Sequence, residues 1–513
     1  MRRFSLVIVF HLMILKAFGQ EKYLSYQHQA GIGENLIIQR ITNKEKNGFL
    51  LTLISKGSIK RIKKEPGSSP ALLLQQVNLK EEEENDFQHT APLSFSQLAL
   101  YRKHFFLGGM YQDQQIWEIF RNRDNYSFFI VRTDVSTGNS EITDVIKGHG
   151  PEKIIYCYER RGVLTLITYM SGSNILNVYQ KKPDQPVSQW KLEIEKDFLN
   201  SSSEYIAAKK FSDLFAAGHF SVYEPGQRCP PQLAQAQTKA FIIPSGIVFA
   251  ISSKDLVTHL IRINIDQANY QIEHIKEGRV LRFPAAINSF IADSILVTAF
   301  IEDQSLIVHL HHLYSENEVQ TLRINEKNLD SLSSNNILKA GSFLSRTDLA
   351  KEKFAAFARD AAENNLFVSA YSENGKAFLS FATQTKTGID GPMLMNLFNL
   401  AAFSFTAINF PNAHPDLGVS STSDEENIES FGLSMDLKNN RISGLEPDFS
   451  TWEKLKLFTL KNNSNQWMQP LQMKNNSNQS SLVFFMNGSY YLGHYFPEQK
   501  KYLVYRIEEK GSD

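Results

Sequence analysis

The sequence predicts an all-β fold made of repeated four-stranded antiparallel sheets. The clearest unit is residues 283–324, where four short apolar runs are separated by turn-forming residues. Runs of about five to nine residues, rich in β-branched and aromatic side chains and bounded by Asp, Asn and Ser, are typical of strands joined by tight turns. The pattern recurs along the chain, and aromatic residues make up 12% of the sequence, which favours β-structure over helix. The four runs are residues 286–291, 295–301, 306–314 and 318–324.

The first 19 residues are typical of a cleavable export signal. Arg2 and Arg3 form a basic start, and residues 4–15 form an apolar run that is short for a membrane span. Small residues stand at Ala17 and Gly19, which predicts cleavage before Gln20. A membrane anchor or a buried first strand would be the alternatives. The sequence therefore predicts a secreted or periplasmic protein.

The rest of the chain, residues 20–513, is interpreted as a single domain with loop insertions. The net charge is 0 over 513 residues, and 42% of the residues are hydrophobic. Because this balance gives no bulk attraction to phosphate backbones, we expect no nucleic-acid partner. A protein or glycan partner fits better, and no transmembrane segment is expected after signal cleavage.

The two cysteines, Cys157 and Cys229, both lie in the exported part of the chain. An oxidising compartment would permit a disulfide between them. However, Cys157 lies inside the apolar run 154–158, where an unpaired cysteine packs as a small hydrophobic residue. Two unpaired cysteines are the preferred interpretation.

Taken in order, the chain first predicts strands at 35–41 and 49–54. A basic segment at 60–64 and an acidic one at 81–86 follow, and opposed charge blocks of this kind usually mark solvated loops. Three full units then come before the one at 283–324, with a partial unit near 214–223. Unit starts are about 46 to 50 residues apart where the repeat is regular. The predicted strands are 103–111, 116–121, 126–135, 140–146, 153–159, 163–170, 175–180, 189–194, 239–243, 246–252, 257–265 and 270–275; near the C-terminus they are 482–486, 489–495 and 502–507.

Two segments leave alternatives open. Residues 347–362 have apolar residues at helical spacing, but the same stretch also fits a first strand at 353–359, before strands 366–371 and 375–383. Residues 391–413 carry no charge. Asn side chains and Pro411 make membrane insertion costly, so a short helix and a buried strand are preferred over a membrane segment or an apolar surface for a partner.

The repeated unit resembles one blade of a β-propeller. Central strands such as 164–168 and 306–310 are apolar on both faces, and one sheet cannot bury both faces alone. Stacking sheets around an axis buries each between its neighbours. The resemblance is at fold level, since no residue motif repeats and no named family follows. Counting the units along the chain predicts seven blades, with eight as the alternative, and the N-terminal strands would complete the blade that begins near residue 480.

Candidate site residues are few. On a strand, His309 and His311 would share one face about 7 Å apart, a spacing that two metal ligands can use. Nothing nearby in the sequence supplies a third ligand, so an exposed outer face is the preferred interpretation. His149, between Gly148 and Gly150, would lie in an inter-blade loop. The carboxylates at 424–426 cannot be placed across a cleft from sequence. We therefore assign no catalytic, cofactor-binding or metal-binding residue, and no cofactor is expected.

Function is accordingly predicted only in outline. The export signal and the repeat, without a reaction motif, favour a non-catalytic scaffold for binding or assembly. The alternative is an exported hydrolase acting on a glycan or similar polymer through carboxylates at the propeller mouth. A purely structural envelope or secretion component is the third possibility.

Overall fold

The structure is a computed structural model. It describes most of residues 104–326 and 346–384, and, outside these stretches, the strands at 20–27, 37–43, 48–55, 58–64, 72–75, 87–90, 336–339, 428–436, 441–445, 481–486, 489–496 and 501–507. All the strands that the structure describes, inside and outside these stretches, form eight sheets. The predicted leader, the acidic segment 81–86 and the uncharged segment 391–413 lie outside the described residues.

Three sheets confirm the predicted four-stranded antiparallel unit. In each of them, strands that follow one another in the chain are also neighbours in the sheet. The first sheet is β7 (His104–Gln112), β8 (Gln115–Asn122), β9 (Phe128–Asp134) and β10 (Ser140–Ile146). The second is β11 (Glu152–Arg160), β12 (Val163–Met170), β13 (Ile175–Lys181) and β14 (Ser188–Glu193). The third is β20 (Ile287–Ala292), β21 (Ile295–Glu302), β22 (Ser305–His312) and β23 (Glu318–Ile324).

A fourth sheet contains the predicted third unit and one added strand. The partial unit near 214–223 forms a 3-10 turn, η1 (Phe211–Phe215), and β15 (Phe220–Tyr223), which pairs in parallel with β16. The other pairs of this sheet are antiparallel. Its remaining strands are β16 (Thr238–Ile243), β17 (Gly246–Ser253), β18 (Val257–Asn264) and β19 (Asn269–Lys276).

The structure decides between the two conformations that the sequence left open for residues 347–362. The segment forms the helix α3 (Lys351–Glu363), so the alternative strand at 353–359 is wrong. Phe354, Phe357 and Ala361 are all fully buried, which places them on one helical face packed into the core. The hairpin that follows is confirmed, and Gly375 at its turn has a φ of 75°, a conformation that glycine adopts without steric cost. The sheet here comprises β24 (Asn336–Lys339), β25 (Arg346–Asp348), β26 (Leu366–Glu373), β27 (Lys376–Gln384), β28 (Ile428–Asp436) and β29 (Arg441–Leu445).

The two ends of the chain meet in one sheet, but the strand that completes it is at residues 20–27, whereas the predicted strands near 35–41 and 49–54 belong to a separate sheet. The strand β1 pairs antiparallel with β32, with Gln20 opposite Ile507. A second sheet near the N-terminus contains the basic segment, because residues 58–64 form β4 and not the predicted loop. The first of these sheets is β1 (Gln20–Gln27), β30 (Ser481–Met486), β31 (Ser489–Phe496) and β32 (Lys501–Ile507). The others are β2 (Ile37–Asn43), β3 (Gly48–Ser55) and β4 (Ser58–Lys64), and the parallel pair β5 (Leu72–Gln75) and β6 (Phe87–Thr90), which lies beside β4.

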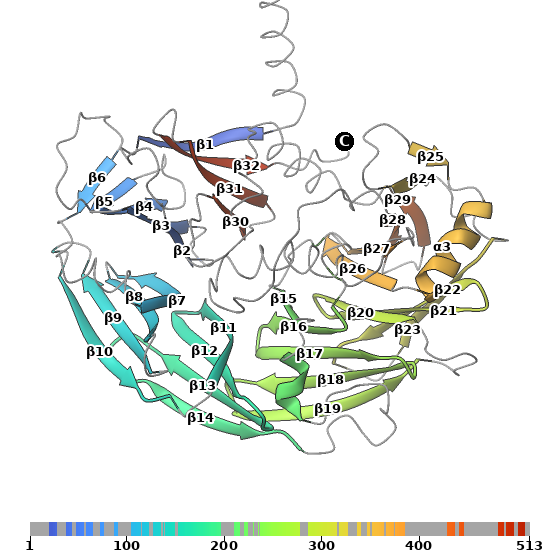
Figure 1. The fold of residues 1–513 in the computed structure, drawn as a ribbon, viewed down its shortest axis with the longest axis horizontal. Coiled ribbons are helices and arrows are strands. Elements are labelled where there is room, and N and C mark those ends of the chain that lie inside the picture. The colour runs from blue at the N-terminus through green and yellow to red at the C-terminus, as the bar shows by residue number, and fades with distance from the viewer. Residues whose placement is uncertain are drawn as a thin grey trace, which may run out of the picture.

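The sheets are arranged side by side around a common centre (Figure 1). In the sheets β7–β10, β11–β14 and β15–β19, the early strands lie toward the centre and the last strand lies at the rim (Figure 1). Contacts link neighbouring sheets, including β7 with β11, β17 with β20 and β20 with β26. This is the arrangement of a β-propeller.

The core shows why the sheets stack. On β17, Ile247 and Phe249 belong to a hydrophobic cluster that joins the sheets β7–β10, β11–β14 and β15–β19. Val248 and Ala250, on the opposite face, belong to a second cluster that includes β20–β23, α3 and β26–β28. Since successive residues of a strand point to opposite faces, both faces of β17 are buried against different neighbours. The expectation of sheets that are apolar on both faces is confirmed.

Both cysteines are thiols and do not form a disulfide. Burial raises the pKa of the Cys157 thiol above its usual range and raises that of Cys229 to about 12. Neither thiol therefore ionises readily at neutral pH. None of the helices among the described residues combines the length and the apolar character that a membrane span requires.

Candidate functional site

Three side chains with metal-ligand chemistry converge between two neighbouring sheets. His309 and His311 are on β22, which is paired on both sides by β21 and β23. Glu277 directly follows β19, the last strand of the preceding sheet, and its backbone N–H donates to the carbonyl of Leu256 at 2.8 Å. The strand pairing of β22 therefore fixes the backbone of the two histidines, and the hydrogen bond to Leu256 fixes the backbone of Glu277.

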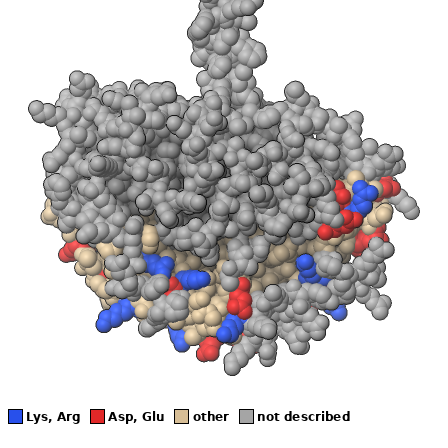
Figure 2. Space-filling view, in the orientation of Figure 1, with Lys and Arg blue, Asp and Glu red and all other residues tan. Residues whose placement is uncertain are grey.

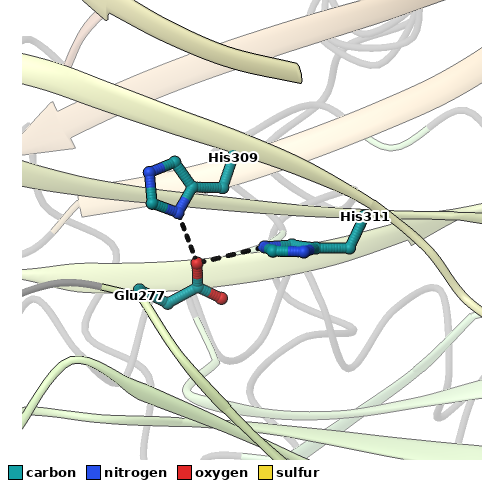
Figure 3. Close-up of side chains that lie close together, drawn as sticks. All are labelled: Glu277, His309 and His311. Atoms are coloured by element: carbon teal, nitrogen blue, oxygen red, sulfur yellow. Dashed lines mark hydrogen bonds and ion pairs between the residues drawn. The ribbon is translucent and has the colours of Figure 1, made fainter. Parts of the chain in front are cut away.

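The geometry centres on one carboxylate oxygen. His309 Nδ1 lies 2.7 Å from Glu277 Oε2, and His311 Nε2 lies 3.3 Å from the same oxygen (Figure 3). The Phe300 ring also contacts the His309 imidazole edge-on, with ring centroids 5.2 Å apart. One ligand atom from each of Glu277, His309 and His311 lies within 4.8 Å of the other two.

The cluster is buried, and the two histidines change the pKa of the glutamate. The Glu277 side chain is 0% exposed, and those of His309 and His311 are 13% and 11% exposed. Burial by itself would raise the pKa of Glu277, but hydrogen bonds from His309 and His311 hold that pKa below its usual value. Glu277 is therefore an anion inside the protein, and its Oε1 is a buried atom without a hydrogen-bond partner among the described residues.

The sequence placed two of these three residues correctly relative to each other. His309 and His311 do share one face of a strand, as predicted. The preferred interpretation of that face as exposed is wrong, because it packs toward the preceding sheet. Glu277 was missed. It precedes the two histidines by 32 and 34 residues, and no local spacing signals a contact that only the stacking of two sheets creates.

Two further polar clusters lie within the core. Glu152 is fully buried, and its Oε1 accepts hydrogen bonds from Thr168, from Asn177 Nδ2 at 2.9 Å and from Tyr179 at 2.8 Å. These donors come from β12 and β13, so the carboxylate ties three strands of one sheet together. Its burial makes it a structural group rather than a carboxylate available to a polymer substrate.

The second core cluster connects three sheets. Lys239 on β16 is 0% exposed, and its Nζ donates to the carbonyl of Ala236 at 2.6 Å and to Asn288 Oδ1. Asn288 on β20 donates in turn from Nδ2 to the carbonyl of Leu366 at 2.9 Å. Burial lowers the pKa of Lys239 to about 7, so at neutral pH and above much of this amine is uncharged within the chain of hydrogen bonds.

The sequence analysis also named candidates at other positions. His149 and the carboxylates at 424–426 lie outside the described residues. Of the described clusters, the one formed by Glu277, His309 and His311 has the donor types that can hold a metal ion. Without an ion, the same atoms form a charged hydrogen-bonded link between two sheets.

The sheets and their arrangement around a common centre define a β-propeller protein. No family model matches the sequence, and no curated protein matches it. Among solved structures, the chain is similar to the WD40 domain of SCAP from fission yeast, with 9% identity, a TM-score of 0.34 and coverage of 96% of this chain and 91% of that one. It is also similar to the Dos1 propeller, with 9% identity, a TM-score of 0.31 and 96% coverage of both chains.

An enzyme is among the similar structures as well. Oligogalacturonate lyase in complex with manganese has 8% identity, a TM-score of 0.30 and coverage of 96% of this chain and 97% of that chain. At these values the similarities carry no argument about activity or ligand. The assignment of the fold rests on the chain's own sheets and their arrangement.

Proposed function

We propose that this protein is an exported, non-catalytic β-propeller that serves as a scaffold for binding a protein partner. Residues 20–513 form its single domain after removal of the leader at residues 1–19. We further propose seven blades: of the eight sheets, the two-stranded pair β5–β6 lies beside β4, and counting it with β2–β4 leaves seven.

The observation that carries the proposal is an apolar pair on the rim strand β10. Ile142 and Val145 are 54% and 66% exposed, among the few large hydrophobic residues that reach the surface of the described chain. They are three residues apart, but Thr143 is an extra residue at a β-bulge, so they lie opposite Val131 and Phe129. Because those two partners are two positions apart on β9, Ile142 and Val145 share one face.

Ion pairs hold the other face of β10 against its neighbours. Asp144 Oδ2 lies 2.9 Å from Lys181 Nζ on the neighbouring sheet, and Arg132 pairs with Glu141 across the ladder. Lys181 also lies over the Trp117 ring, 4.8 Å from its centroid. The strand is therefore held in place, and it presents an ordered apolar pair at the edge of a sheet. Such an edge suits an extended or apolar segment of another protein.

The surface charge supports a protein partner over nucleic acid. On the described part of the face seen in Figure 2, basic and acidic residues are interspersed. The net charge of the whole chain is 0. A phosphate backbone would require a concentration of positive charge.

The proposal is tested by partner capture from the extracellular material of the source. The mature protein is immobilised, and bound proteins are measured by cross-linking and quantitative mass spectrometry. We expect a specific partner to be lost with the double variant Ile142→Asp/Val145→Asp, because two charges would replace the apolar contact. Tyr314→Asp is the matched control and should retain the partner, because Tyr314 is 59% exposed but lies in the turn that follows β22.

Two outcomes would contradict this function. If the purified protein released sugar products from a panel of glycans, the hydrolase hypothesis would replace the scaffold hypothesis. Export with cleavage would be contradicted if the released protein kept its leader, or if the protein were absent from the exported fraction. Sequencing of the mature N-terminus, which is expected at Gln20, measures the cleavage directly.

A further inference from the structure

We propose that Glu277, His309 and His311 bind a divalent transition-metal ion, zinc in the first place, and so link two neighbouring blades. This inference goes beyond the scaffold function and does not depend on the identity of a partner. Two imidazole nitrogens and a carboxylate oxygen are a donor set that zinc uses in proteins. The close-up shows the three side chains directed at one point between their strands (Figure 3).

The buried carboxylate supplies the first reason. The Glu277 side chain is 0% exposed, and its Oε1 has no hydrogen-bond partner among the described residues. A buried polar atom without a partner costs free energy, and a buried charge costs more. Two imidazoles satisfy only Oε2. A cation at this point would compensate the charge and could also use the second oxygen.

The distances supply the second reason. With zinc–nitrogen and zinc–oxygen bonds of about 2.0–2.2 Å, ligand atoms of a tetrahedral site are about 3.3–3.5 Å apart. His311 Nε2 and Glu277 Oε2 are already 3.3 Å apart, and His309 Nδ1 is 2.7 Å from the same oxygen. An ion therefore requires the His309–Glu277 pair, now 2.7 Å apart, to open by about 0.6–0.8 Å. The three ligand atoms, which lie within 4.8 Å of one another, would also have to close around the ion.

The strands and apolar side chains around the ligands supply the third reason. His309 and His311 alternate along an interior strand, so the ladders on both sides fix their spacing. Ile307 lies on the same face, in an apolar cluster with Leu256, Ile287 and Phe300. This wall excludes water on one side of the site and strengthens binding of a cation by the carboxylate. Three protein ligands leave a coordination position for water.

Metal binding should also stabilise the fold, because the ligands come from two sheets. A ligand that binds the folded chain but not the unfolded one raises stability by mass action. The two blades would then be held together by coordination bonds as well as by apolar packing. The charged link seen between Glu277 and the two histidines is the metal-free form of the same connection.

The test uses the full mature chain, stripped with chelator and then equilibrated with Zn²⁺ at neutral pH. Bound zinc is measured by mass spectrometry of the metal, affinity by competition with a chelating dye, and stability by thermal unfolding. We expect one zinc ion per chain and a higher unfolding temperature with zinc. His309→Ala, His311→Ala and Glu277→Gln should each weaken binding by at least the roughly 10- to 100-fold that the loss of an outer-shell partner costs.

His312→Ala is the matched control. His312 is the next residue on the same strand but is exposed and points away from the cluster, so its loss should leave the affinity within about twofold. Co²⁺ bound to the unaltered chain gives an independent readout that needs no variant, since a low-coordinate site absorbs strongly in the visible range. Absence of stoichiometric zinc, or equal binding by the three ligand variants and by His312→Ala, would overturn the proposal and leave the cluster as an ion-paired link.

Discussion

At the scale of single residues, the buried polar groups lie where sheets meet. Lys239, Asn288 and the carbonyl of Leu366 connect three sheets through two hydrogen-bonded steps. Ser252 and Ser289 add a hydroxyl pair at 2.8 Å between β17 and β20. Apolar packing between sheets is not directional, whereas hydrogen bonds of this kind specify one alignment of neighbouring sheets over another.

Lys239 predicts a pH dependence whose sign follows from its pKa. That pKa is about 7 in the folded chain, against 10.5 for an ordinary lysine. Between these values the unfolded chain binds a proton that the folded chain does not, so the free energy of unfolding should rise with pH. The slope is about 1.4 kcal/mol per pH unit. Denaturant unfolding of the wild type and of Lys239→Met between pH 7 and 9.5 should show this slope only in the wild type.

The control for that prediction is Lys254→Met. Lys254 is exposed in the turn between β17 and β18, so its replacement should preserve the wild-type slope. Parallel curves for the wild type and Lys239→Met would show that burial does not set the protonation of this amine.

At the scale of elements, close approach of strands from different sheets depends on a small residue. A Cβ at Gly108 on β7 would lie 2.7 Å from Cys157 Sγ and 3.2 Å from Cys157 Cβ. Gly108 also adjoins an irregularity in the pairing of β7 with β8. Glycine at this position lets β7 approach β11 of the next sheet, and the buried Cys157 fills the space that the glycine leaves.

We therefore expect Gly108→Ala to destabilise the protein by about 1–3 kcal/mol, because it overpacks the interface between two sheets. Cys157→Ala removes the sulfur atom and should offset part of that loss. A double-mutant cycle by urea unfolding measures the coupling. Additive effects of the two changes would mean that these side chains do not meet.

The helix α3 shows that the conformation of a segment can depend on the part of the core against which it packs. Its apolar spacing was visible in the sequence, but a strand over 353–359 fitted the repeat equally well. Phe354 and Phe357 pack into the cluster that also holds β20–β23, so tertiary burial of one helical face decides the conformation. The basic strand β4 is the converse case, because pairing with β3 overrides a composition typical of a loop.

At the scale of the whole molecule, the first and last strands close the fold. The edge strand β1 is joined to β32 over the pairs from Gln20–Ile507 to Gln27–Lys501. Without β1, the strand β32 would become an exposed edge at the point where the chain ends are joined, and such edges promote aggregation.

Deleting residues 20–27 should lower the thermal unfolding midpoint and promote association, measured by calorimetry and light scattering. Appending the same eight residues after Asp513 should restore both properties. Gln20 lies opposite Ile507, so residues 508–513 can serve as the turn of a new hairpin. Failure of the appended strand to rescue the deletion would contradict closure by this pairing.

The sequence by itself determined the strands of the regular units and their grouping. Alternating or continuous apolar runs bounded by turn residues depend on neighbours a few positions away, so the units at β7–β14 and β16–β23 could be predicted nearly to their ends. The shared face of His309 and His311 followed from the same two-residue period.

Only the tertiary structure decided which faces meet. It turned the face of His309 and His311 toward the preceding sheet, placed Glu277 against them and selected a helix at 351–363. These outcomes depend on contacts between residues 30 or more positions apart or on burial by another sheet, and neither is encoded in local spacing. Strand formation is a local property of the chain, whereas a site built between two sheets exists only after those sheets have stacked.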